Sequence, residues 1–208
     1  MSTRLKRLIT PEEYLAIERD LSAKHEYHYG EMFAMGGAST KHNQITFNLA
    51  GILHAQLKDR PCVAFANDMR VKISTTGSYV YPDVVATCQP PQFEDKHLDT
   101  LLNPQAAIEV LSDSTEAFDR GEKFEMYSGV DSLREYLLVA QKYPHISHFQ
   151  RDADADWTLR MVHGLDQAVE VASIGCTLRL ADVYAKVEFP PIEETDRAAG
   201  IHGPGSPR

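Results

Sequence analysis

Two short apolar runs that each carry one acidic residue constrain the fold of this chain most. Residues 81–86 read Tyr-Pro-Asp-Val-Val-Ala and contain Asp83, and residues 106–111 read Ala-Ala-Ile-Glu-Val-Leu and contain Glu109. Short apolar runs bounded by turn residues are typical of strands inside a sheet. An ionised carboxylate there is costly unless it is paired with a cation or binds a metal. If the strands are neighbours, the two acids can share a hard divalent cation, which prefers oxygen ligands.

Both acids also have a structural interpretation. Pro82 favours a sheet edge or a bulge, where Asp83 can cap a turn or pair with an arginine such as Arg70. Glu109 lies in the middle of its apolar run, so it must either point into a polar cleft or form an ion pair. We favour a functional role for Glu109.

Lys123 lies in a helix predicted to follow the second run. The motif 113–116, Asp-Ser-Thr-Glu, is typical of a capping box, and Gly129 is placed to end the helix. Asp119 and Tyr127 share a helical face with Lys123. If this face packs over Glu109, the ammonium can reach the metal centre. The alternative is a solvated lysine paired with Asp119.

The remaining pattern predicts one domain of mixed α and β structure. Thr10, Pro11 and Glu13 form a capping box that starts a helix ending before Ser22. Further predicted elements are strands within 25–35 that turn at Gly30, a helix from Ser39 or Thr40 to about Lys58, and strands at 62–66, 69–73, 79–87, 105–111 and 135–140. An antiparallel meander is expected at 145–151, 157–163 and 168–174, and 178–187 fits a strand or a short helix.

Domain limits and the main loop follow from local composition. Residues 1–9 are predicted to be a flexible N-terminus, 10–189 a single domain, and 190–208 a disordered tail rich in Pro, Gly and charged residues. The polar loop 89–103 is expected to move or to contact a substrate.

Composition excludes some classes of protein. The 208 residues include 21 Lys+Arg and 30 Asp+Glu, a net charge of −9, which argues against indiscriminate coating of nucleic acid but permits a local basic groove. No apolar run approaches the roughly 20 residues of a membrane span. Cys62, Cys88 and Cys176 lack metal-type spacing, and with no signal peptide recognised they are predicted to be reduced core thiols of a cytoplasmic protein.

The acidic motifs resemble a known family. Residues 81–85, 108–112, the segment from Asp119 through Lys123 to Val130, and 135–139 are similar to the Uma-type endonuclease family of the PD-(D/E)XK restriction-endonuclease-like superfamily. The resemblance spans about residues 10–187. One departure is Leu111, which stands two positions after Glu109 where the superfamily has lysine. Lys123 on the following helix would replace it.

This resemblance implies an α/β (α+β) fold, with a restriction-endonuclease-like mixed β-sheet core flanked by helices and a C-terminal antiparallel β meander. It also implies an α-β-β-β-α-β core order, dependence on Mg²⁺ or Mn²⁺, and hydrolysis of nucleic-acid phosphodiester bonds, with DNA the expected substrate. Asp83 and Glu109 would be metal ligands, the Val110 carbonyl a third donor, and Lys123 would position the attacking water.

Further candidates surround this set. Glu26 or Glu31 would complete the metal shell, with His42 and Asp68 as additional candidates, although a histidine at a helix start is more often a cap or a surface residue. Positive charge for nucleic acid is expected from Lys41, Arg70, Lys72 and Arg120. Tyr27, Tyr29, Tyr79 and Tyr81 could stack bases or simply pack across strands.

Two other functions stay open at this point. One is a nuclease fold used for binding or assembly without turnover, which Leu111 favours. It predicts that Asp83, Glu109 and Lys123 do not converge, or that metal does not bind. The other is a metal-dependent hydrolase of a small phosphate ester, which predicts a small closed pocket. A nuclease that cuts two strands is expected to be a homodimer.

Overall fold

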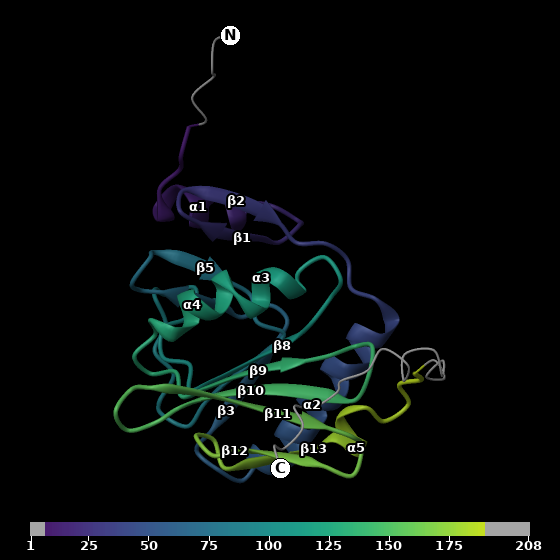
Figure 1. The fold of residues 1–208 in the computed structure, drawn as a ribbon. Helices are drawn as coiled ribbons and strands as arrows, with labels where there is room; N and C mark the ends of the chain where they lie inside the picture. Colours follow the sequence, from purple (N-terminus) through teal and green to yellow (C-terminus); the bar gives the residue numbers. More distant parts are fainter. Residues whose placement is uncertain (1–6, 190–208) are drawn as a thin grey trace, which may run out of the picture.

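The computed structural model describes residues 7–189, which form a six-stranded sheet, a five-stranded sheet and a two-stranded hairpin, with helices packed against them (Figure 1). Residues 1–6 of the predicted flexible N-terminus 1–9, and the predicted tail 190–208, lie outside the described residues. The helices are α1 (Pro11–Glu18), α2 (Thr40–Leu57), α3 (Glu116–Arg120), α4 (Glu122–Ser128) and α5 (Leu180–Val183). No helix within this described range is long and apolar enough to cross a membrane.

The central sheet has six strands in the order β11-β10-β9-β8-β6-β3. Its strands are β3 (Val63–Ala66), β6 (Val84–Thr87), β8 (Ala106–Val110), β9 (Glu135–Val139), β10 (His145–Arg151) and β11 (Trp157–His163). Only β8 and β9 are parallel neighbours here, and α3 and α4 form the crossover that a parallel pair requires. The order α2, β3, β6, β8, α3–α4, β9 matches the predicted α-β-β-β-α-β core.

The second sheet has five strands in the order β2-β1-β5-β4-β7. They are β1 (His25–His28), β2 (Glu31–Ala34), β4 (Arg70–Ile73), β5 (Ser78–Val80) and β7 (Thr100–Leu101). The β1–β2 hairpin turns at Tyr29 and Gly30, as predicted, and both turn residues have positive φ. Tyr27 pairs with Tyr79 across strands and both pack against Tyr14, so these tyrosines are core residues rather than base-stacking candidates.

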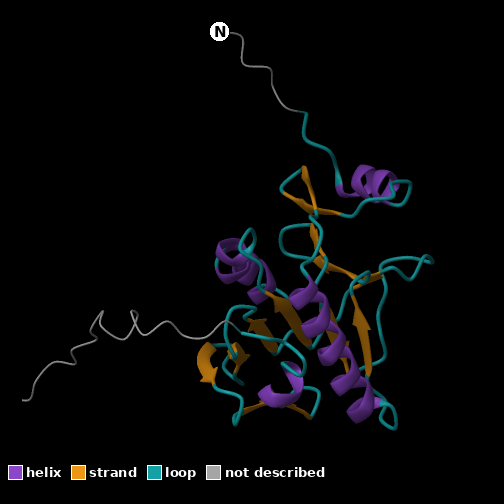
Figure 2. Ribbon diagram, turned by 90° about the vertical axis from the view of Figure 1, so that its right-hand side faces the viewer, coloured by secondary structure: helices purple, strands orange, loops and turns teal. Residues whose placement is uncertain are grey.

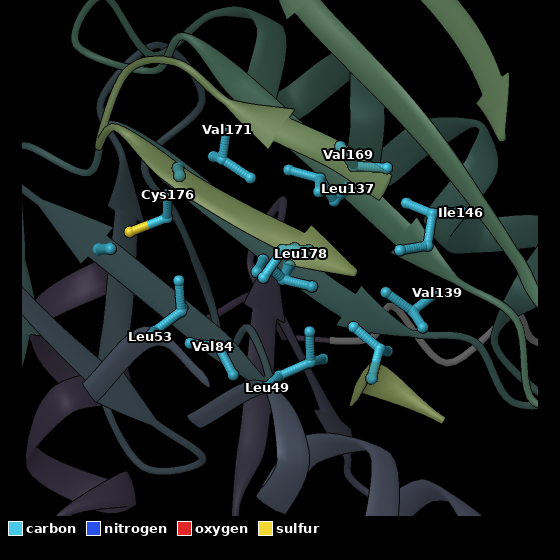
Figure 3. Close-up of a cluster of buried hydrophobic side chains, with 14 of the residues drawn as sticks. Leu49, Leu53, Val84, Leu137, Val139, Ile146, Val169, Val171, Cys176 and Leu178 are labelled. Carbon is cyan, nitrogen blue, oxygen red and sulfur yellow. The ribbon is translucent and has the colours of Figure 1, made fainter. Parts of the chain in front are cut away.

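Helix α2 and a C-terminal hairpin cover one face of the central sheet. The hairpin is β12 (Ala168–Val171) with β13 (Cys176–Arg179). Figure 2 shows the long helix lying across the strands, and Figure 3 shows Val169, Val171 and Leu178 of the hairpin facing Leu137 and Val139 of the sheet. The other face packs against α4 and the five-stranded sheet, with Tyr127, Tyr136 and Leu138 in that core.

Several predicted elements need correction. The predicted strand 79–87 is two strands in different sheets, because Pro82 has no N–H for a ladder and the chain changes sheets at 81–83. Helix α1 ends at Glu18, before the predicted end, and Ile17 and Leu21 are exposed. The predicted three-strand meander forms in part: β10 and β11 pair antiparallel as expected, but β12 pairs with β13 and not with β11. Both alternatives for 178–187 occur in part, as the end of β13 and then α5.

The predicted capping box at 113–116 does not form. Thr115 makes no side-chain cap bond, and the Ser112 hydroxyl instead accepts a hydrogen bond from the Thr115 N–H. The helix predicted to run through Tyr127 breaks at Gly121 into α3 and α4, and it ends at Gly129 as expected. This break sets the angle at which α4 crosses the sheet and carries Lys123.

The cysteine prediction is also corrected. Cys62 and Cys88 form a disulfide bond, and Cys176 is a buried free thiol. Val63 pairs with Thr87 in the antiparallel ladder of β3 and β6, so the next residue outward on each strand, Cys62 and Cys88, stands opposite the other. The wide sequence separation hid this contact, which only strand pairing creates.

Candidate active site

Lys123 is the centre of a buried cluster of charges. Its side chain is 5% exposed, and its Nζ lies 2.8 Å from Glu109 Oε1, 3.0 Å from Glu26 Oε1 and 3.6 Å from Asp119 Oδ1. Burial alone would lower the pKa of this lysine, but Glu109 and Glu26 outweigh burial and raise the pKa well above its usual value. Lys123 is therefore a fixed positive charge at neutral pH. The pairing with Asp119 considered from sequence is present, but only as the longest of three contacts.

Glu109 is the acid that this cluster stabilises least. Burial raises its pKa well above the usual value; Lys123 opposes this rise, while Asp119, Asp83 and Glu26 add to it. Glu26 behaves differently, because Lys123 and a hydrogen bond with His28 overcome its burial and bring its pKa to about 2. One ammonium thus serves three carboxylates, and the cluster has surplus negative charge that a second cation would relieve.

Asp83 lies beside this cluster at the start of β6. The ladder pairs Val84 with Ile108, so the residue before Val84 approaches the end of β8. The Val110 N–H donates a 2.7 Å hydrogen bond to Asp83 Oδ2, and His42 Nε2 lies 3.2 Å from the same oxygen. The alternative pairing of Asp83 with Arg70 does not occur, because Arg70 pairs with Asp99.

Three further side chains hold this arrangement together. The Tyr127 hydroxyl donates to Glu109 Oε1 at 3.3 Å. Gln141 Nε2 donates to the Leu111 carbonyl at 2.6 Å, and Gln141 Oε1 accepts from the Ser39 hydroxyl at the N-cap of α2. Sequence reasoning missed Tyr127 and Gln141 as site residues. Tyr127 had a signal in its position four residues after Lys123, whereas Gln141 had none.

The predicted supporting residues separate into two groups. Glu26, Lys41, His42 and Val110 line the same large cavity as Asp83, Glu109 and Lys123. The other predicted residues do not line this cavity: Glu31, Asp68, Arg70, Lys72 and Arg120. Glu31 lies opposite His28 at the end of the hairpin, and Asp68 is an exposed partner of Lys24. The three basic residues have partners elsewhere: Arg70 is buried against Asp99, Lys72 pairs with Glu94, and Arg120 contacts Glu116 and Ser147. Long-range packing, not sequence proximity, decides this division.

The loop 89–103 does not line the cavity either. Arg19 binds Asp95 and Asp99, and Arg70 binds Asp99, so the loop is tied to α1 and β4. Burial works to raise the pKa of Asp99, but the two arginines hold it well below its usual value. The expectation that this loop moves or contacts a substrate stays a prediction.

The cavity has a volume of about 1790 Å³. Pockets for small molecules usually measure roughly 300–1,000 Å³, so the space is large enough for a segment of a polymer. Lys24, Lys41 and Lys142 add positive charge to its lining. The acid partners of Lys24 and Lys142 are Asp68 and Asp113, which are 83% and 81% exposed. Such surface pairs are weak enough for a phosphate to replace the carboxylate.

The site has the donor chemistry for a hard divalent cation. Among residues 7–189, no three His, Cys, Asp or Glu side chains are grouped closely enough to hold a metal by themselves. Mg²⁺, however, is usually bound through one or two carboxylates and keeps several waters. Asp83, Glu109 and the Val110 carbonyl provide oxygen donors of this kind, and the surplus negative charge around Glu109 favours a cation there.

Comparisons with known proteins agree with this architecture. A family model described as "Putative restriction endonuclease" matches residues 11–181. The chain belongs to this family. Two relatives from Synechocystis sp. (strain ATCC 27184 / PCC 6803 / Kazusa) are "Uncharacterized protein sll1609", 37% identical over 79% of this chain and 93% of its own length, and "Uncharacterized protein slr1290", 35% identical over 87% and 94%.

A solved structure supports the fold. It is a putative nuclease belonging to DUF820 from Anabaena variabilis ATCC 29413, with a TM-score of 0.68 over 85% of this chain and 97% of that one. The two sequences are 17% identical, so the likeness concerns the fold alone. The restriction-endonuclease-like fold class predicted from the sequence is confirmed.

Proposed function

We propose that this chain is a metal-dependent nuclease that hydrolyses phosphodiester bonds in nucleic acid, with DNA as the expected substrate. The observation that carries the proposal is the convergence of Asp83, Glu109 and the Lys123 ammonium in one large cavity. The family to which the chain belongs supports the same reaction class.

In this mechanism Asp83, Glu109 and the Val110 carbonyl would hold Mg²⁺ or Mn²⁺. The bound ion would lower the pKa of a coordinated water and neutralise charge that develops on the phosphate. The Val110 N–H and His42 fix the Asp83 carboxylate in place, and the Tyr127 hydroxyl does the same for Glu109. Lys123 stays protonated and donates hydrogen bonds to the attacking water or to a phosphate oxygen.

The same geometry bears on the alternatives. An inactive binding domain predicted either that Asp83, Glu109 and Lys123 lie apart or that metal does not bind. The three residues line one cavity, and Lys123 on α4 supplies the cation near Glu109 that the buried Leu111 does not. The calorimetric metal titration below tests the second half of that prediction. A hydrolase of small phosphate esters predicted a small closed pocket, whereas the cavity measures about 1790 Å³. Both observations favour turnover on a polymer.

The test is cleavage of plasmid, single-stranded DNA and RNA with Mg²⁺ or Mn²⁺ and with EDTA, alongside calorimetric titration of the metals. Asp83→Asn and Glu109→Gln keep side-chain size and should reduce cleavage at least about 10²–10³-fold, as expected when one charged group leaves an electrostatic active site. Asp59→Asn, an exposed acid just after α2 that does not line the cavity, is the matched control and should cleave like the unmodified chain. Cleavage that persists in EDTA, or in both site variants, would contradict the proposal.

The homodimer and the cytoplasmic location stay predictions. Sedimentation of the chain with and without DNA tests the first of them. A monomer that nicks one strand at a time would retain the proposed chemistry and remove the need for a dimer.

A further inference from the structure

Four aromatic side chains form one side of the cavity beside the charged cluster. They are His28 and Tyr29 at the turn of the β1–β2 hairpin, Phe33 on β2 and Phe118 on α3, and they are called the aromatic wall below. The His28 ring lies 5.5 Å from the Phe33 ring and 5.3 Å from the Phe118 ring, measured between centroids. Phe33 is 49% exposed and Tyr29 is 58% exposed. Large ring faces therefore meet the open cavity.

His28 is the buried member of the aromatic wall. The residue is 5% exposed, and its Nε2 lies 3.3 Å from Glu26 Oε2. Its Nδ1 is buried and has no hydrogen-bond partner among residues 7–189. Buried polar atoms in native proteins nearly always have a partner, because leaving one unpaired costs free energy. Nδ1 is an exception within residues 7–189, and the His28 ring is held by its contacts with Glu26, Phe33 and Phe118.

The aromatic wall is joined directly to the proposed catalytic cluster. Glu26 contacts His28 through Oε2 and Lys123 through Oε1, at 3.0 Å. The Tyr81 N–H also donates to Glu26 Oε1, so the backbone fixes this carboxylate between the two groups. A ligand group on the wall thus lies next to the place where the scissile phosphate would bind.

We propose that the aromatic wall stacks an unpaired nucleobase adjacent to the scissile phosphate, so that single-stranded nucleic acid is the preferred substrate class. This inference rests on the proposed nuclease function. Bases in a duplex are stacked on one another and offer only their edges in the grooves, whereas a base in a single strand can present its face to an aromatic ring. Lys24, Lys41 and Lys142 line the same cavity and would meet the backbone phosphates.

The test is fluorescence anisotropy in EDTA with three labelled 12-nucleotide probes: a single strand, the same strand with central abasic positions, and its duplex. Phe33→Ala should weaken binding of the intact single strand about tenfold, the size expected from loss of one base–aromatic stack. Phe33→Tyr keeps a stacking ring and should bind within about twofold of the unmodified chain. Phe47→Ala is the matched control, because Phe47 is 74% exposed on α2 and does not line the cavity.

The abasic strand separates stacking from backbone contacts. It should bind as weakly as Phe33→Ala binds the intact strand, and Phe33→Ala should cause no further loss on it. Equal binding of duplex and single strand by the unmodified chain, or equal effects of Phe33→Ala and Phe47→Ala, would overturn the inference.

Cleavage of the same probes with Mg²⁺ or Mn²⁺ distinguishes the two proposals. Equal cleavage of duplex and single strand, with no effect of Phe33→Ala, overturns the stacking inference and leaves the nuclease proposal standing. Binding that depends on Phe33 and on intact bases, without cleavage of any probe, overturns the nuclease proposal and supports the wall as a base-binding surface.

Discussion

Two buried glutamates on neighbouring strands have opposite environments. Glu109 on β8 is 4% exposed and faces α4, whereas Glu135 on β9 is fully buried and faces the β12–β13 hairpin on the other side of the sheet. Glu109 lies in the middle of an apolar run, and Glu135 begins one directly after Arg134. What differs is the set of donors that the fold brings to each carboxylate.

Glu135 receives hydrogen bonds from fixed donors. His148 Nε2 lies 3.0 Å from it, the backbone N–H groups of Ala172 and Ser173 donate at 3.0 and 2.8 Å, and the Ser173 hydroxyl donates as well. Burial would raise the pKa of Glu135, but the hydrogen bonds from His148 and Ser173 lower it overall. This glutamate is a structural anion that links the hairpin to the sheet.

Within residues 7–189, the groups that compensate Glu109 are the Tyr127 hydroxyl and a lysine that it shares with two other acids. Its pKa is raised by burial and by those neighbours. The contrast teaches that a buried acid with complete hydrogen bonding has a structural role. A buried acid whose charge is incompletely compensated beside a cavity indicates a functional site.

The largest expected effect on stability comes from replacing the basic side chain that contacts each glutamate. Lys123→Met should lower the free energy of unfolding by about 3–5 kcal/mol, because it leaves buried carboxylates without their cation. His148→Gln should cost only about 1 kcal/mol, since Glu135 keeps its backbone donors. Urea denaturation measures both. Equal losses in the two variants would contradict the comparison.

A double variant keeps this test informative if Lys123→Met fails to fold. Glu26 has a pKa of about 2 and is the ionised partner of Lys123. Glu26→Gln in the Lys123→Met background should therefore recover about 1–3 kcal/mol of the loss.

The second prediction concerns pH, measured without divalent metal. In the folded chain the pKa of Glu109 is raised above its unfolded value near 4.3. The free energy of unfolding, compared with that of Glu109→Gln, should therefore fall as the pH rises from about 4.3 toward the folded pKa. The expected slope is about 1.4 kcal/mol per pH unit. The folded pKa of Glu135 is lowered, so its contribution should be full above about 4.3 and be lost as pH falls through the folded pKa. Denaturation of the unmodified chain, Glu109→Gln and Glu135→Gln from pH 3 to 8 gives the two slopes. Slopes of the same sign would break the comparison.

The smallest expected effects on stability come from removing one hydroxyl group that donates to each glutamate. Tyr127→Phe and Ser173→Ala should each lower the free energy of unfolding by about 0.5–1.5 kcal/mol, the net value of one hydrogen bond. Only Tyr127→Phe should also reduce nuclease activity, because its partner Glu109 is the proposed metal ligand. A loss of activity in Ser173→Ala of the same size would show that Glu135 also affects the reaction.

Much of the local structure follows from the sequence. The capping box at Thr10 and Glu13, the hairpin turn at Gly30 and the start of α2 at Ser39 are short-range features whose hydrogen bonds join residues within a few positions. The apolar runs around Asp83 and Glu109 likewise predicted buried strands, because their composition suits a sheet interior wherever they are placed.

Prediction errors arise where a segment or a side chain can pair with more than one part of the chain. The segment 168–171 has an alternating apolar pattern that suits pairing with either β11 or β13, and only the need to cover the core against α2 selects β13. The apolar run through Tyr81 and Val85 shows no sign that its halves belong to different sheets, apart from Pro82. Arg70 and Lys72 had the charge expected of a phosphate contact, but Asp99 and Glu94 pair with them in the folded chain.

The sequence by itself determined most of the strands, the starts of α1 and α2, and the need of Asp83 and Glu109 for compensation, because those depend on residue type and short spacing. Only the tertiary structure decided which compensation each acid received. Glu109 obtained a shared lysine at a cavity, and Glu135 obtained backbone N–H groups from a hairpin more than 35 residues away. The free energy of a buried charge depends on donors within about 3 Å, and long-range packing alone brings such donors into place.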